Sequence, residues 1–258
     1  MEHRTTVGLF DSGVGGITVL ADCMRKLPSA DFLFYADSDH VPYGTKTRDE
    51  VTEYSMAAVR YLAGLGADAV VVACNTATSM AIRDLRAAFS FPIVGMEPAV
   101  KPAAKEHPDG KILVCATPLT IGGEKLHTLI RRSFHGTSAP DLLALPELVK
   151  MAEAERFDEE NVLSALNSAV GAGNGYEAVV LGCTHFLYFK DSFRRYFPEA
   201  ELVDGNEGTV NRLADLIRVK PAEGKGKVRF FTSGREALPG SPEEARFLRF
   251  LARASALG

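Results

Sequence analysis

Two stretches of the chain repeat one pattern, and each ends in a cysteine. Residues 66–74 read GADAVVVAC and residues 175–183 read GYEAVVLGC. A glycine, an acidic residue two positions later, a short apolar run and a thiol therefore occur twice. Cys74 and Cys183 form a candidate pair of matched thiols, one in each half of the chain. Because a thiolate is both a base and a nucleophile, the pair predicts acid–base or covalent chemistry.

The runs before the two cysteines predict how the thiols are positioned. A short β-branched run bounded by glycine is typical of a parallel strand buried on both faces. In open parallel α/β sheets, ligands bind at the carboxyl ends of the strands, where the next helices begin. A helix N-terminus stabilises a thiolate and lowers the thiol pKa from about 8.5 to roughly 3.5–7.5. Cysteine is also among the most often buried residues, so a structural role is the alternative for Cys23, Cys74, Cys115 and Cys183.

Apolar runs alternate with helical periodicity along the whole chain. We expect strands at residues 7–10, 32–36, 69–73, 93–95, 112–115, 142–145, 178–181, 202–203 and 228–231. Helices are expected, among other places, at residues 17–26, 48–65, 79–89, 157–170 and 242–256. This alternation predicts an α/β fold with mostly parallel sheets flanked by helices. Prolines near residue 96 and the segment 204–208 mark two chain crossings, which predict one domain of residues 1–96 plus 208–258 and another of residues 97–207.

Composition excludes several classes of protein. With 258 residues, 46% of them hydrophobic, the chain can bury a large core. A net charge of −4 without a basic cluster argues against nucleic-acid binding. No apolar stretch approaches the ~18 residues of a membrane span, and no signal peptide is recognisable, so we expect a cytoplasmic protein. Four cysteines in a chain of this length are expected to be free thiols.

Polar residues follow several of the expected strands. The turn FDSGVGG at residues 10–16 opens a helix, and its glycines let the backbone approach a ligand closely. Its G-x-G-G spacing differs from the G-x-G-x-x-G of dinucleotide-binding loops, which argues against nicotinamide or flavin. In CNT at 74–76 and CTH at 183–185, helix capping explains the Asn and Thr residues as well as ligand binding does. His185, two residues after a strand-end thiol, is a candidate catalytic group.

In order and spacing, these motifs resemble those of the cofactor-independent glutamate racemases of the aspartate/glutamate racemase superfamily. The matching segments are DSGVGG at 11–16, PYG at 42–44, ACNTAT at 73–78 and GCTH at 182–185, with further matches at 97–98, 116–117 and 230–234. The resemblance implies two pseudo-symmetric α/β domains with the amino acid held in the cleft between them, in a homodimer that needs no pyridoxal phosphate and no metal.

The resemblance also implies roles for individual residues. Cys74 and Cys183 match the two catalytic thiols. Asp11 matches the acid that supports the first thiol, and His185 with Glu153 matches the group that supports the second; Glu153 is aligned through the pattern P-x-x-V-x-x-x-E at 146–153. The residues that match substrate-binding positions are Asp11, Ser12, Tyr43, Gly44, Asn75, Thr76, Thr184 and His185.

The implied reaction interconverts L- and D-glutamate by removing a proton from one face of the α-carbon and returning one to the other face. We expect backbone N–H groups after Ser12, Asn75 and Thr184 to bind the substrate carboxylate. D-glutamate would feed peptidoglycan synthesis. The alternatives are a racemase of another acidic amino acid such as aspartate, or a non-catalytic amino-acid-binding relative. Two departures, FL at 186–187 and GG at 122–123 where Tyr-Pro and Lys-Ser are frequent, concern side-chain recognition and dimer geometry.

Two unrelated kinds of site are alternatives to this interpretation. A zinc site could use Cys74, Cys115, Cys183 and His185, but these residues lack the close spacing that zinc ligands usually show. A thiol hydrolase is disfavoured because Cys183 and His185, only two residues apart, do not make a catalytic pair by adjacency alone, and because no G-x-S-x-G motif is present.

Overall fold

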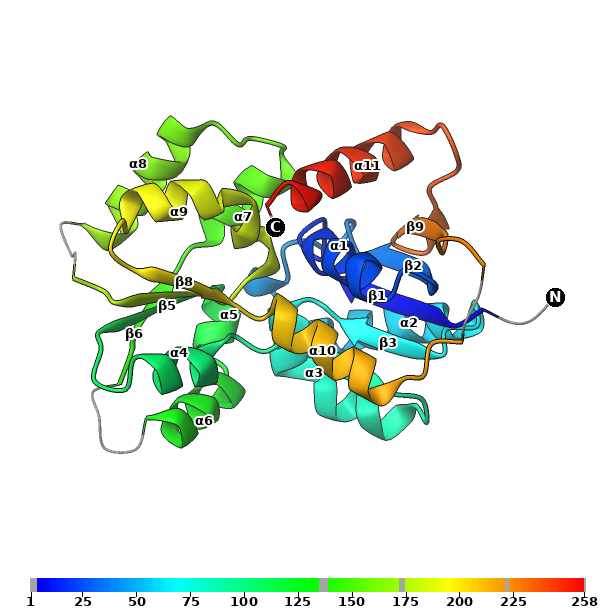
Figure 1. The fold of residues 1–258 in the computed structure, drawn as a ribbon, viewed down its shortest axis with the longest axis horizontal. Helices are drawn as coiled ribbons and strands as arrows, with labels where there is room; N and C mark the ends of the chain where they lie inside the picture. The colour runs from blue at the N-terminus through cyan, green and yellow to red at the C-terminus, as the bar shows by residue number, and fades with distance from the viewer. Residues whose placement is uncertain (1–3, 135–138, 172–174, 221–222, 258) are drawn as a thin grey trace.

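The computed structural model describes residues 4–134, 139–171, 175–220 and 223–257. Two sheets lie side by side, each with helices on both faces (Figure 1). Among the described residues, no helix is long and apolar enough to cross a membrane.

The first sheet contains six strands in the order β10-β9-β2-β1-β3-β4. Its strands are β1 (Thr6–Asp11), β2 (Asp31–Ala36), β3 (Ala69–Val72), β4 (Ile93–Gly95), β9 (Val228–Thr232) and β10 (Arg235–Glu236). All neighbours are parallel except β9 and β10, which form an antiparallel hairpin. The chain leaves this sheet after β4 and returns to it at β9.

Helices cover both faces of the first sheet. They are α1 (Ile17–Lys26), α10 (Asn206–Leu216) and α11 (Pro242–Ser255) on one face, and α2 (Arg48–Gly64) and α3 (Asn75–Ala88) on the other. Alternate residues of β1 point to opposite faces, so Leu9 joins the core under α1 while Phe10 joins the core under α2 and α3. Burial on both faces explains why these strands are continuous apolar runs.

The second sheet has the order β6-β5-β7-β8, with all strands parallel. Its strands are β5 (Ile112–Ala116), β6 (Asp141–Ala144), β7 (Ala178–Leu181) and β8 (Glu201–Asp204). The helices around it are α4 (Val100–Glu106), α5 (Pro118–Ile121), α6 (Glu124–Ser133), α7 (Pro146–Glu153), α8 (Glu159–Val170) and α9 (Lys190–Tyr196). Two 3₁₀ segments are η1 (Tyr43–Thr45) beside the first sheet and η2 (Thr184–Phe189) beside the second. One buried cluster joins α1 and α11 to α7, α8 and η2, so the two sheets share part of their core.

The predicted α/β fold class is confirmed, and each predicted strand lies within two residues of an observed one. The helix expected at 79–89 begins earlier, at Asn75, because the Cys74 sulfur caps it by accepting a hydrogen bond from the Ala77 N–H. The hairpin strand β10 was not predicted, since its two exposed residues carry no apolar run. The proposed domain boundaries stay a prediction; the second falls just inside α10.

Candidate active site

The carboxyl ends of strands from both sheets border one pocket. Its lining residues are Ser12, Pro42, Tyr43, Gly44, Cys74, Asn75, Thr76, Thr117, Val149, Cys183, Thr184 and His185. Ser12 follows β1, Cys74 follows β3, Thr117 follows β5 and Cys183 follows β7. The two thiols that repeat in the sequence therefore face the same space from different sheets.

Cys74 lies at the N-terminus of α3, with 5% of its surface exposed. Its Sγ accepts from the Ala77 N–H at 3.4 Å and lies 3.6 Å from Ser12 Oγ, which in turn lies 3.5 Å from Asp11 Oδ1. Burial, together with the nearby Asp11 carboxyl, raises the pKa of the Cys74 thiol to about 12, although the Ala77 hydrogen bond opposes this shift. Cys74 is thus a thiol at neutral pH, connected to Asp11 through one hydroxyl group.

Asp11 is fully buried at the end of β1. Its carboxyl accepts hydrogen bonds from the Gly13 N–H at 2.9 Å and from Thr184 Oγ1 at 3.1 Å. Burial raises the pKa of Asp11 to about 6, and His185 and these hydrogen bonds limit the rise. Thr184, predicted to bind substrate, therefore uses its hydroxyl proton to join the two halves of the site.

Cys183, His185 and Glu153 form a chain of contacts on the opposite side of the pocket. Cys183 Sγ lies 3.7 Å from His185 Nδ1, and His185 Nε2 lies 2.7 Å from Glu153 Oε1. Burial alone would lower the pKa of His185, but its hydrogen bonds to Cys183 and Glu153 raise this pKa well above 6.5. Burial likewise opposes ionisation of Glu153, but the His185 bond holds the Glu153 pKa below its usual value. The favoured arrangement is a protonated imidazole between a carboxylate and a sulfur.

The glycine-rich turn after β1 fits directly against this chain of contacts. The Val14 N–H donates to Glu153 Oε1 at 2.9 Å. A Cβ atom added at Gly13 would overlap Glu153 Oε1, and one added at Gly15 would overlap Thr184 and His185. The glycines are therefore required for close approach between the two halves, and not for a dinucleotide.

Tyr43 and Gly44 form another wall of the pocket, in η1. The Tyr43 hydroxyl donates to Asp37 Oδ2 at 2.6 Å, and Asp37 also accepts from Ser233 Oγ at 2.8 Å. The Tyr43 hydroxyl proton is thus directed away from the pocket. A Cβ at Gly44 would lie 2.8 Å from Thr117 Cβ, so glycine allows η1 to contact the second sheet's loop.

Asn75 and Thr76 are the first two residues of α3, so their N–H groups have no partner within the helix. Thr76 Oγ1 lies 2.9 Å from Thr117 Oγ1 and 3.2 Å from Thr120 Oγ1. This end of the pocket suits a carboxylate. The expected contribution of N–H groups after Ser12 is wrong in part, because the N–H groups of residues 13 and 14 already donate to Asp11 and Glu153.

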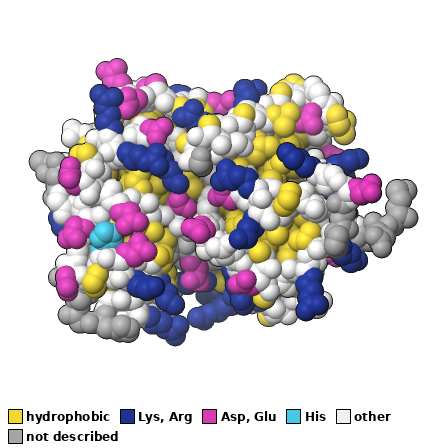
Figure 2. Space-filling model, viewed as in Figure 1, with side chains coloured by type: hydrophobic (Ala, Val, Ile, Leu, Met, Phe, Trp, Pro, Cys, Tyr) yellow, Lys and Arg dark blue, Asp and Glu magenta, His cyan; other side chains and the backbone are white. Residues whose placement is uncertain are grey.

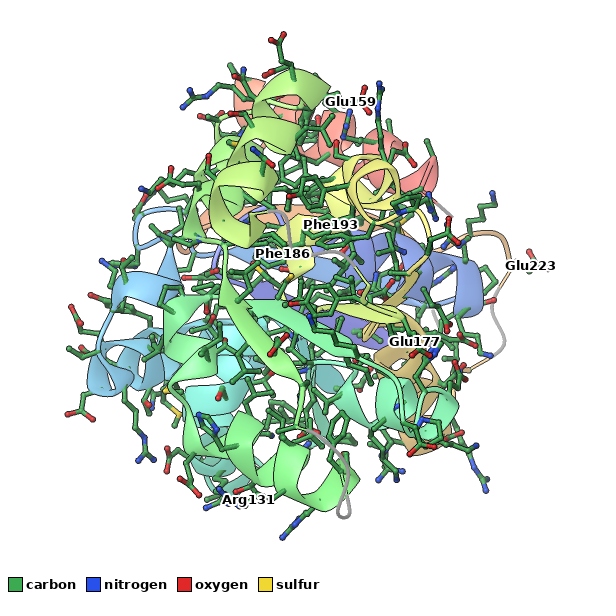
Figure 3. The ribbon with its side chains drawn as sticks, turned by 90° about the vertical axis from the view of Figure 1, so that its left-hand side faces the viewer. Arg131, Glu159, Glu177, Phe186, Phe193 and Glu223 are labelled. Atoms are coloured by element: carbon green, nitrogen blue, oxygen red, sulfur yellow. The ribbon has the colours of Figure 1, made fainter. Side chains whose placement is uncertain are left out.

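Sequence reasoning missed several residues of the site. Thr117 lies in the matching segment 116–117 but was not named as a site residue, although it follows β5 much as Cys183 follows β7. Val149, which lines the pocket from α7, is the valine of the pattern at 146–153, and Asp37, which holds Tyr43, directly follows β2, but neither was named as a site residue. The residues of the two family departures, 122–123 and 186–187, do not line this pocket. Phe186 packs in the core against Phe193, with ring centroids 6.3 Å apart (Figure 3).

The suggested zinc ligands do not form a cluster. Cys115 is buried within β5 and does not line the pocket. In the parts of the chain that the structure describes, no three His, Cys, Asp or Glu side chains are arranged to hold a metal ion.

Comparison with known proteins places the chain in a family. The model of the Asp/Glu/hydantoin racemase family matches residues 18–213. A glutamate racemase of Halothermothrix orenii is 46% identical, over 95% of this chain and 97% of that protein, and one of Campylobacter curvus is 48% identical over 96% of each. Escherichia coli glutamate racemase, solved in complex with L-glutamate, superposes with a TM-score of 0.82 at 29% identity, over 98% of this chain and 96% of that one. The chain therefore belongs to the Asp/Glu/hydantoin racemase family and is an isomerase.

Proposed function

We propose that the protein interconverts L- and D-glutamate, with Cys74 and Cys183 as the two proton-transfer groups and without pyridoxal phosphate or metal. The observation that supports this most directly is that both thiols line one pocket, each at the carboxyl end of a strand in a different sheet. The choice of glutamate rests on the relatives named glutamate racemase at 46% and 48% identity.

The unequal surroundings of the sulfurs suggest the resting protonation state. We assign the thiolate to Cys183, because its sulfur lies 3.7 Å from the His185 imidazole, and the thiol to Cys74, which lies near the Asp11 carboxyl. The thiolate removes the α-proton from one face, and the electron pair left on the α-carbon is shared with the α-carboxylate. That pair then takes the proton of the opposite thiol, which leaves inverted substrate, a thiol at Cys183 and a thiolate at Cys74. The other enantiomer binds to the form with a thiol at Cys183 and a thiolate at Cys74, and reacts by the same steps in reverse.

Electrostatics explains why a single charge is shared by the two sulfurs. If each sulfur approaches the α-carbon to about 3.5 Å, the sulfurs are roughly 7 Å apart. Two thiolates at that separation repel by about 2.4 kcal/mol at an effective dielectric constant of about 20, close to two pK units. One sulfur therefore keeps its proton at each stage of the reaction.

The substrate carboxylate must accept part of the carbanion's charge, and this is the most demanding part of the reaction. The N–H groups of Asn75 and Thr76 and the hydroxyl cluster of Thr76 and Thr117 provide donors at one end of the pocket. Donors that are already oriented before the reaction stabilise developing charge without a cost of reorganisation.

Serine variants of the two cysteines test this function. We expect Cys74→Ser and Cys183→Ser each to lose at least about 10²-fold in racemisation, because a hydroxyl is a far poorer base than a thiolate. One-sided exchange of the α-proton with deuterated water should persist in the variant that keeps the thiolate. Circular dichroism of L-glutamate and L-aspartate, incubated without added cofactor, measures the rate and the substrate preference.

Cys115→Ala is the matched control, since it removes a buried thiol outside the pocket and should retain activity. Full racemisation by either serine variant would rule out the two-thiol scheme. Faster inversion of aspartate than of glutamate would reassign the substrate.

We further propose that each sheet with its helices is a domain, with boundaries near 96/97 and 207/208, and that the protein is a cytoplasmic homodimer whose D-glutamate supplies peptidoglycan synthesis. Light scattering of the purified protein tests the dimer. Restored growth of a strain that requires D-glutamate tests the role.

A further inference from the structure

The C-terminal helix α11 contacts both halves of the active site. It packs on α1 and β9, on the side of the first sheet. Figure 1 shows it running from the outer edge near β9 to the middle of the molecule, where α7 lies. Three arginines at positions 246, 249 and 253 are spaced so that they share one face of α11. They contact the last residue of α7, a residue just after α7, and η2, respectively.

Arg246 binds the residue that holds the catalytic histidine. Its Nη2 donates to Glu153 Oε2 at 3.0 Å and to the Glu153 carbonyl oxygen at 2.8 Å. The other carboxylate oxygen, Oε1, contacts His185 Nε2 at 2.7 Å and accepts from the Val14 N–H at 2.9 Å. Both oxygens of Glu153 are therefore engaged, and the one facing away from His185 depends on α11.

A strained residue next to this contact is secured by the same helix. Glu155, just past the end of α7, has φ +54°, a left-handed conformation in which glycine is usual. The conformation costs a non-glycine residue on the order of 1 kcal/mol. Its carboxylate accepts two hydrogen bonds from Arg249, at 2.9 and 2.8 Å, and lies 3.6 Å from Arg246 Nε. Glu155 has a side chain where glycine would be less strained, and this side chain anchors the end of α7 to α11.

Arg253 makes a third contact. Its guanidinium lies 3.9 Å from the centre of the Phe157 ring, and its Nη2 donates to the Tyr188 carbonyl at 3.4 Å. The Tyr188 hydroxyl donates to the Val14 carbonyl at 2.9 Å. Val14, whose N–H binds Glu153, is therefore held at its carbonyl as well.

We propose that α11 is an interdomain clamp on the His185–Glu153 pair, and that Arg246 is a positioning residue that keeps the Glu153 carboxylate aligned with His185. Without Arg246, Glu153 Oε2 loses its charged donor, and the carboxylate is held only at Oε1, by the Val14 N–H and by His185. The carboxylate is then less well aligned with His185, so the hydrogen bond that favours the protonated imidazole weakens, and the Cys183 sulfur loses part of its charged neighbour. The kinetic part of this inference rests on the proposed function, whereas the effect on Cys183 does not.

Arg246→Met tests the clamp, because methionine retains an apolar stem and removes the donors. We expect kcat to fall about 10-fold or more with KM changed less than about threefold, since misalignment of catalytic groups acts on the chemical step. The alkylation rate of Cys183 by iodoacetamide, followed by peptide mass spectrometry at a fixed pH, should fall several-fold. Arg246→Lys, which keeps one charged donor, should recover part of both losses.

Arg195→Met is the matched control, because it removes another Arg–Glu ion pair of similar length. Arg195 Nη1 in α9 lies 2.7 Å from Glu159 Oε2 in α8. It should leave both readouts unchanged. Wild-type kcat and wild-type alkylation in Arg246→Met would overturn the clamp, as would equal losses in the two methionine variants. Slower Cys183 alkylation in Arg246→Met, in a protein that does not racemise glutamate, would support the clamp and remove the proposed function.

Discussion

The sulfur atoms of Cys74 and Cys183 have different electrostatic surroundings in this pocket. Cys74 is linked through Ser12 to a buried carboxyl that favours the thiol, whereas Cys183 contacts an imidazole whose pKa is raised. In the proposed reaction, two thiols with different surroundings interconvert two mirror-image substrates. The asymmetry makes different predictions for the residues on each side.

Glu153→Gln should shift the basic limb of kcat/KM to lower pH by about 1 to 2 units. The change removes a charge-assisted hydrogen bond worth about 1.5–3 kcal/mol, so His185 loses its proton at lower pH. Rates measured from pH 6 to 10 test this, with Glu147→Gln, an exposed acid on the same helix, as control. An unmoved basic limb would show that Glu153 does not charge His185.

Asp11→Asn should change stability in a pH-dependent way. The folded-state pKa of Asp11, about 6, lies above its unfolded value, so its protonated form stabilises the fold at low pH and that contribution is lost as pH rises through 4 to 6. Relative to wild type, the variant should gain about 2 to 3 kcal/mol in free energy of unfolding between pH 4 and pH 8. Urea unfolding at both pH values measures it; a pH-independent difference would contradict the raised pKa.

Individual site residues could be predicted from the sequence where they lie in a short recognisable segment. The thiols were found from a repeat within the chain, and Glu153 from the resemblance to an eight-residue family pattern. In the structure Glu153 lies 2.7 Å from His185. Arg246 was not found, because it acts on Glu153 through a contact that depends on the tertiary fold. No motif near Arg246 indicates its partner.

The repeated segments differ once they leave the strands. After Cys74 the chain enters an α-helix directly, whereas after Cys183 it forms the 3₁₀ segment η2 before α9. Every residue of η2 is buried, including Phe186 and Phe189. A segment that buries side chains all round cannot present the single apolar stripe of an amphipathic α-helix. The repeat therefore predicted the two strands, but it did not predict that the segments after the two cysteines differ.

Gly13→Ala tests the fit between the β1–α1 turn and α7. The added methyl group would overlap Glu153 Oε1, so Glu153 must move away from His185. We expect kcat to fall about 100-fold, in line with a displacement of about 1 Å at a catalytic group. Gly208→Ala in α10, where a Cβ meets nothing within 4 Å, should keep activity and gain about 0.5–1 kcal/mol of stability. Wild-type kcat in Gly13→Ala would mean that the turn adjusts freely.

On the scale of the whole molecule, the pocket belongs to neither sheet alone. Figure 2 shows acidic and basic side chains intermixed on one face, without a field of one sign. The α/β class could be predicted because runs and periodicities are local properties. The placement of one sheet against the other could not, because it depends on contacts such as Thr184 with Asp11 and Arg246 with Glu153.

Bound substrate should stabilise both halves together. At about 100 times its dissociation constant, glutamate should raise the free energy of unfolding by about 2.7 kcal/mol, in one cooperative transition. Thermal unfolding with L-glutamate, D-glutamate and L-lysine tests this, and lysine should have no effect. Stabilisation of only one of two separate transitions would place the ligand within a single sheet's half.

Hydrogen bonds cross between the two halves in both directions. Thr184 donates to Asp11 of the first half, and the Val14 N–H donates to Glu153 of the second. Under the proposed function, any separation wide enough to release product must break both bonds, which leaves Asp11 with the Gly13 N–H and Glu153 with His185 as donors from their own halves. Water or the departing amino acid has to replace the two lost donors as the gap widens. Opening of the pocket therefore requires water to enter it. In the proposed reaction, release of one enantiomer and binding of the other depend on hydration of Asp11 and Glu153.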